Sequence, residues 1–165
     1  MEQQVNWDVV FNAGRNKFLN DLSNHKIDPS LASQYGAPLM NALYGLKPYI
    51  LSDAAKSGNI SANTKQYINK AIIPSMHKTI DDYWKNLGYI KKTTFKMMSK
   101  GNESRITGTI GSALSSLIYG MNAGLSATGS KNSNLFGVID DLETYMGGSG
   151  SPLAVSALHK IQSLT

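Results

Sequence analysis

Apolar residues recur every three or four positions in most segments of this chain, which is the spacing of one face of an α-helix. The first such segment runs from residue 7 to residue 22, and others lie at 68–87, 106–121, 135–146 and 153–164. No segment alternates between apolar and polar residues as a half-buried strand would. The sequence therefore predicts an all-α protein, a helical bundle with an N-terminal helical extension. The apolar or small positions of the first periodic segment are Trp7, Val10, Phe11, Gly14, Phe18 and Leu22.

Proline and glycine residues divide the chain into helical pieces. A second helical region is predicted after the turn at Asp28-Pro29-Ser30, up to about Lys56. Pro38 and Pro48 interrupt it, because proline removes a backbone amide donor. Ser57-Gly58-Asn59 then predicts a turn. We assign residues 1–58 to the N-terminal helical extension and residues 59–165 to a basic helix and the helical bundle, the two together forming one structural unit.

The composition excludes several kinds of chemistry. The chain has no cysteine, so disulfides, thiolate metal sites and cysteine nucleophiles are impossible. Charged residues make up only 16% of the chain, below the roughly 25% that is usual in globular domains. A surface with few charges is expected for a protein that neighbouring subunits cover, and equally for a domain that is rich in loops. Residues 1–8 show neither a basic nor an apolar signal region, so we expect synthesis in a cytoplasm.

The positive charge is concentrated in the middle of the chain. Residues 56–105 hold ten basic and three acidic groups, whereas residues 1–55 hold four and five, and residues 106–165 hold two and three. A basic block between nearly neutral flanks predicts a surface that faces the phosphates of a nucleic acid. It is also typical of a solvated helix face.

A helix that continues through residues 68–96 would carry its lysines on the side opposite its apolar stripe, within about 80° of one another. These residues, called the lysine ridge, are Lys70, Lys78, Lys85, Lys92 and Lys96. Pro74 should kink the helix. Only Asp81 and Asp82 lie among the lysines, so we interpret the ridge as a phosphate-binding surface, the alternative being a solvated helix face. Further candidate contacts to nucleic acid are Lys91, Lys100, Arg105, Arg15 and Lys17.

Residues 106–130 carry no charge and are long enough to cross a membrane. One alternative function is therefore a membrane or envelope protein anchored by this segment. Nine Ser, Thr or Asn residues and five glycines favour a buried helix instead. Small residues recur there at four-residue steps, which predicts close packing against another helix. This small-residue ladder consists of Ser112, Ser116, Gly120 and Gly124.

No pattern indicates catalysis or metal binding. None of the histidines has a second histidine at the four-residue spacing of paired zinc ligands. His77 precedes Asp81 by four residues, which predicts a local ion pair or hydrogen bond. Asp81-Asp82 and Asp140-Asp141 are adjacent pairs whose side chains diverge by about 100°, which predicts solvated faces. We expect no catalytic residue, metal or cofactor; the second alternative is a helical enzyme whose site the sequence does not reveal.

Four short motifs resemble the major capsid proteins of filamentous archaeal viruses, the rudivirus and lipothrixvirus group. They are packing and turn residues that span about a quarter of the chain: Leu117-Ile118-Tyr119-Gly120-Met121, Asn132-Ser133-Asn134, Val138-Ile139 and Gly150-Ser151-Pro152.

The resemblance implies a coat protein that assembles around double-stranded DNA, with copies of itself or a related coat subunit, in a filamentous virion. The resemblance does not specify whether a lipid envelope surrounds the virion. In that family the more N-terminal helices embrace the DNA, but residues 1–55 of this chain lack a basic arm. The helix after Pro152 also extends beyond the simplest form expected for the family. The contact with DNA is therefore expected mainly at the lysine ridge, with Arg15 and Lys17 contributing less.

Overall fold

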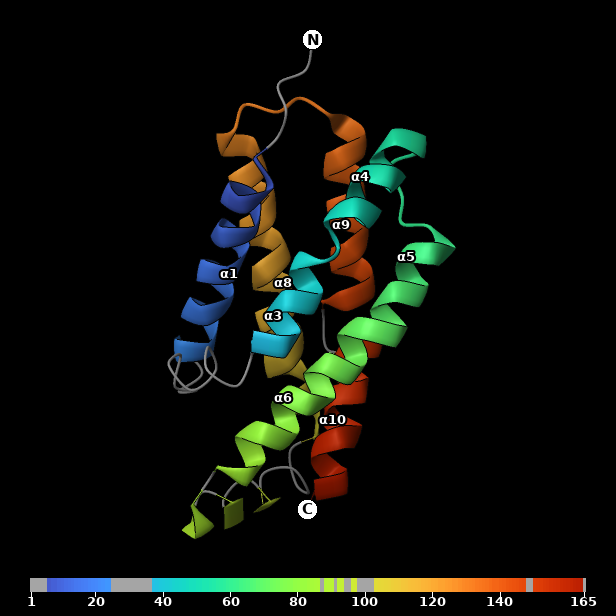
Figure 1. Ribbon diagram of the computed structural model, residues 1–165. Coiled ribbons are helices and arrows are strands. Elements are labelled where there is room, and N and C mark those ends of the chain that lie inside the picture. Colours follow the sequence, from blue (N-terminus) through green and yellow to red (C-terminus); the bar gives the residue numbers. More distant parts are fainter. Residues whose placement is uncertain are drawn as a thin grey trace.

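The computed structural model describes residues 6–24, 37–86, 88–90, 92–93, 96–97, 103–147 and 150–164, and regular secondary structure in these residues is helical (Figure 1). The prediction of an all-α protein is therefore confirmed, and the arrangement is compatible with a helical bundle. The elements are α1 Trp7–Asn24, α3 Ala37–Tyr44, α4 Lys47–Lys56, α5 Ala62–Tyr67, the π-helix η1 Ile68–Ile72, α6 Ile73–Lys85, α8 Glu103–Ala127, α9 Ser133–Met146 and α10 Pro152–Leu164.

Proline residues stand where three of the helices begin. Pro38 and Pro48 lie in the first turns of α3 and α4, and Pro152 is the first residue of α10. Proline is tolerated there because the amides of a first helical turn have no partner within the helix. Pro38 thus marks the start of α3, and Pro48 lies where α4 begins after α3 has ended.

The helices share one hydrophobic core to which both parts of the chain contribute. Helix α1 packs along α8, α8 also contacts α9 and α10, α4 packs against α9, and α6 contacts α3 and α10. In α1 the buried apolar side chains include those of Trp7, Val10, Phe11 and Phe18, at the positions that the helical spacing indicates. Residues 1–58 therefore supply helices to the same core as the rest of the chain.

Two glycines allow α1 and α8 to approach closely. A Cβ atom built on Gly120 would lie 2.6 Å from the carbonyl oxygen of Ala13 and 2.8 Å from the Cα of Gly14. A Cβ on Gly14 would in turn lie 2.6 Å from the carbonyl oxygen of Leu117. This contact, called the glycine crossing, leaves no room for a side chain at either glycine.

The small-residue ladder takes part in this packing over only part of its length. Gly120 and Gly124 are buried against α1, and a Cβ on Gly124 would lie 2.8 Å from the Cβ of Ala13. Ser116 is half-buried, whereas Ser112 is exposed. The close contact with α1 thus involves the two glycines.

Helices α5 and α6 form one rod that is joined by the π turn η1 (Figure 1). In the π turn the amide of Ile73 donates to the carbonyl of Ile68, five residues earlier, instead of four. Pro74 follows directly and has no amide hydrogen to donate. The wide turn therefore lies where proline interrupts the regular α-helical hydrogen bonding.

Two carboxylates fix the loop that joins α4 to α5. Asp53, which is only 3% exposed, accepts hydrogen bonds from the Ser61 amide at 3.0 Å and from the Thr64 hydroxyl. Asp141 on α9 accepts the Ile60 amide at 2.8 Å. Burial opposes ionisation of Asp53, but the hydrogen bonds from Thr64 and Ser61 outweigh it and hold its pKa below the ordinary value. Asp53 is thus a buried charge that caps the start of α5.

Candidate nucleic-acid interface

Three lysines of the ridge lie exposed along the η1–α6 rod: Lys70 on η1, and Lys78 and Lys85 on α6. The opposite side of the rod is buried at Ile72 and Met76. Successive residues of a π turn are rotated about the helix axis by less than the 100° of an α-helix. In a regular α-helix the directions of Lys70 and Lys78 would differ by about 80° about the axis, and η1 reduces this angle. The π turn therefore helps to bring these lysines onto one line.

Both aspartates of α6 are engaged with lysines. The Lys78 Nζ lies 3.2 Å from the Asp82 Oδ2 within the helix, and the Lys160 Nζ on α10 lies 3.0 Å from the Asp81 Oδ1. Both aspartates are half-buried, so the solvated face predicted for this pair is present only in part. An exposed pair such as Lys78–Asp82 contributes at most about 1 kcal/mol, so a phosphate could compete for that ammonium group.

His77 also makes its contact with α10. Its Nε2 lies 2.8 Å from the Ser156 Oγ, on a helix far away in sequence. The predicted local pair between His77 and Asp81 is therefore wrong. Helix α10 packs against this side of α6 and supplies a partner for each residue, Ser156 for one and Lys160 for the other.

The lysine ridge is interrupted where α6 ends. Helix α6 stops at Lys85, and a separate helical turn closes when the Lys92 amide donates to the Gly88 carbonyl at 2.9 Å. The Lys92 Nζ lies 5.7 Å from the centre of the Trp84 ring, and Lys96 is exposed. The expectation of one helix through residue 96 is therefore wrong, and the regular helical spacing does not relate Lys92 and Lys96 to the lysines of α6.

The remaining candidate contacts are not brought into one line with the rod. Arg15 and Lys17 lie on α1, which packs along α8, and the Lys17 Nζ lies 5.1 Å from the centre of the exposed Tyr119 ring. Arg105 belongs to α8, but its side chain lies outside the described part of the structure. Lys91 and Lys100 lie outside the described residues altogether.

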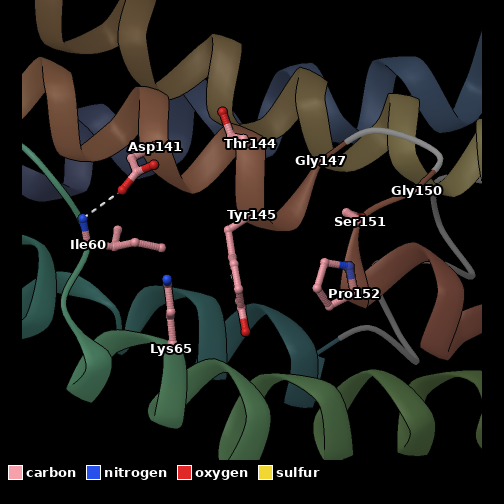
Figure 2. Close-up of a pocket in the computed structure, with 9 residues that line it drawn as sticks. All are labelled: Ile60, Lys65, Asp141, Thr144, Tyr145, Gly147, Gly150, Ser151 and Pro152. Atoms are coloured by element: carbon pink, nitrogen blue, oxygen red, sulfur yellow. Dashed lines mark hydrogen bonds between the residues drawn. The ribbon is translucent and has the colours of Figure 1, made fainter.

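A hollow of about 440 Å³ lies between α5, α9 and the start of α10 (Figure 2). Figure 2 shows Tyr145 projecting from α9 toward α5, and the Lys65 Nζ lies 5.6 Å from the centre of its ring. Other polar groups of the hollow are engaged within the fold. Asp141 accepts the Ile60 amide, and the Ser151 hydroxyl donates to the Met146 carbonyl at 2.8 Å.

Asp140 is exposed, as the solvated face predicted for this pair requires, whereas Asp141 is half-buried. Asp141 anchors the Ile60 amide, and Asp140 accepts a hydrogen bond of 2.7 Å from the Asn122 side chain on α8. Helix α9 thus uses both carboxylates to hold its neighbours.

The histidines and carboxylates of the described residues form no group of three or more that could hold a metal ion. None of the helices in these residues combines the length and the apolar character that a membrane crossing requires. Comparison of the chain with protein-family models, with curated proteins and with solved structures gave no match.

Proposed function

We propose that this chain is a structural protein that binds double-stranded DNA through the lysines of the η1–α6 rod and assembles with copies of itself or a related subunit. The observation that carries the proposal is the exposed line of Lys70, Lys78 and Lys85 on the outer side of a rod whose other side is buried in the fold. These positions can reach a polyanion without disturbing the core. The resemblance to capsid proteins extends the proposal to the DNA-containing coat of a filamentous virion.

The surface outside the rod is consistent with contacts between subunits. Charged groups make up only 16% of the residues, and several large apolar side chains are exposed on the helices. The clearest examples on α1, α3, α4 and α8 are Val9, Tyr44, Leu51 and Tyr119. Electron microscopy of the purified protein with and without DNA would test assembly. Filaments that form with DNA are expected, and particles that stay monomeric in both samples would contradict the proposal.

A variant in which Lys70, Lys78 and Lys85 are all changed to glutamine should bind DNA more weakly and with a smaller salt dependence. Because each lysine that contacts a phosphate releases about one counterion, the slope of log affinity against log salt should decrease by about three. Lysine is a point charge with no preference among base pairs, so two duplexes of unrelated sequence should bind alike. Fluorescence anisotropy over a range of salt concentrations measures both quantities.

In the matched control, glutamine replaces Lys47, Lys56 and Lys131, which are exposed on other parts of the chain. This control removes the same charge and should leave the slope nearly unchanged. If both variants lose the same affinity, binding depends on net charge alone and the rod is not the interface. Circular dichroism should show the parent's helix content in both variants.

A further inference from the structure

Asp81 lies between two of the lysines that are proposed to bind DNA. It follows Lys78 by three residues and precedes Lys85 by four, so both lysines are its neighbours on the surface of α6. An acidic residue four positions before a lysine is the more favourable order for an ion pair within a helix. The spacing alone therefore favours a pair between Asp81 and Lys85.

The structure gives Asp81 a different partner. The Lys160 Nζ on α10 lies 3.0 Å from the Asp81 Oδ1, and the two side chains are only 23% and 34% exposed. In the neighbouring pair of Lys78 with Asp82, the lysine is 63% exposed. An ion pair that is partly shielded from water is stronger than an open one. Lys160 therefore holds Asp81 away from Lys85, which lies exposed at the end of α6.

A second contact keeps α10 in register with α6. The His77 Nε2 lies 2.8 Å from the Ser156 Oγ, and Asp81 and Lys160 each follow four residues later in their own helix. Both helices run toward the lower end of the molecule in Figure 1. The two contacts thus belong to one interface, and the position of Lys160 beside Asp81 follows from the packing of these helices.

We propose that Lys160 is a positioning residue for DNA binding, which pairs with Asp81 and so keeps the Lys85 ammonium group available to a phosphate. Without Lys160, Asp81 would pair with Lys85 within the helix, and a phosphate would have to displace that carboxylate. The packing of α10 thereby regulates the affinity of a surface that lies on another helix. This inference rests on the proposed function, because it concerns a lysine of the η1–α6 rod.

Fluorescence anisotropy with a DNA duplex at low salt tests the proposal. Lys160→Gln should weaken the affinity about threefold, because Asp81 then competes for Lys85 and repels nearby phosphates. Adding Asp81→Asn to this variant should restore the parent's affinity, since the competing carboxylate is removed. Lys160→Arg should bind like the parent, because its guanidinium group can also pair with Asp81.

A matched control separates this local effect from net charge. Lys160→Gln combined with Asp140→Asn has the parent's net charge, but the carboxylate removed lies on α9 instead of beside Lys85. This control should bind as weakly as Lys160→Gln alone. Circular dichroism should show the parent's helix content in every variant, with unfolding within a few degrees of the parent.

NMR spectroscopy of the full chain tests the same contact without DNA. In protein with isotope-labelled lysine Cε atoms, the Lys85 signal should respond to Asp81→Asn when Lys160 has been changed to glutamine. In the parent background the same substitution should change the Lys85 signal little. The pairing is thus measured independently of DNA binding by the rod.

Parent-like affinity of Lys160→Gln would overturn the proposal. A loss that persists after Asp81→Asn is added would also overturn it, because Lys160 would then act on DNA directly or through the fold. Full recovery with Asp140→Asn would do so too, since net charge alone would explain the loss. If the triple glutamine variant of the rod binds like the parent, the proposed function fails instead. A Lys85 signal that ignores Asp81→Asn in the Lys160→Gln background overturns this inference itself.

Discussion

Replacing Gly120 with leucine should destabilise the protein by about 3 kcal/mol, the upper end of the usual cost of overpacking, because the side chain would enter the glycine crossing between α1 and α8. Even a Cβ atom at this position would lie 2.6 Å from the carbonyl oxygen of Ala13, and backbone atoms cannot move aside as a flexible side chain can. For a chain of this size, the loss corresponds to a decrease in Tm of about 6 to 12 °C. Thermal unfolding followed by circular dichroism measures it.

Gly150→Leu is the matched control for this prediction. A Cβ built on Gly150 meets no atom within 4 Å, and the residue is exposed. The control should unfold within a few degrees of the parent. A parent-like Tm for Gly120→Leu would show that α1 is not held against α8 at this contact.

Replacing Asp53 with alanine should cost about 2 to 4 kcal/mol, since it leaves the buried Thr64 hydroxyl and the Ser61 amide without their acceptor. Urea denaturation gives the free energy of unfolding for the parent and the variant. Ser52→Ala, at the exposed neighbouring position on α4, should cost less than about 0.5 kcal/mol. Similar losses in the two variants would contradict the capping role of Asp53.

The Asp53 carboxylate should also make stability depend on pH. Because its pKa in the folded protein is below the ordinary value of 3.8, its charge stabilises the fold fully above that value. The contribution decreases as the pH falls through the lowered pKa. The difference in unfolding free energy between the parent and Asp53→Asn should therefore be largest above pH about 5 and shrink toward pH about 2. A difference that does not change with pH would show that the charge of Asp53 is not stabilising.

Local sequence patterns predicted most of the helical structure. The periodic segment from Trp7, the turn at Ser57-Gly58-Asn59 and the helix start at Pro152 all have counterparts in the structure. These features depend on residues within one or two helical turns of one another. Apolar spacing and the position of proline are therefore sufficient to predict them.

Contacts between distant parts of the chain could not be predicted in this way. His77 and Asp81 are correctly spaced to meet within one helix, but their partners are Ser156 and Lys160. Likewise, Asp141 contacts the Ile60 amide, which lies 81 residues earlier. Which partner a polar side chain finds depends on how the helices pack, and no local pattern specifies that.

The candidate interface was predicted only in part for the same reason. The exposed positions of Lys70, Lys78 and Lys85 follow from the amphipathic pattern, but the end of the helix at Lys85 does not. Nor does the sequence show that Tyr89 and Ile90 are exposed, because large apolar residues are more often buried. Exposure became visible only once the packing of the other helices was known.

The π turn between α5 and α6 has a consequence for the length of this segment. It accommodates one more residue per turn than an α-helix, so it is equivalent to a single-residue insertion. Loss of one residue within the π turn would restore α-helical bonding and leave the faces of α6 nearly where they are, because the shorter α turn completes the same rotation. Loss of one residue within α6 would instead rotate everything after it by about 100° about the helix axis. Such a rotation would turn the residues after the deletion, such as Asp81, away from their partners on α10. The segment should therefore tolerate the loss of a residue at the π turn more easily than anywhere else along the rod.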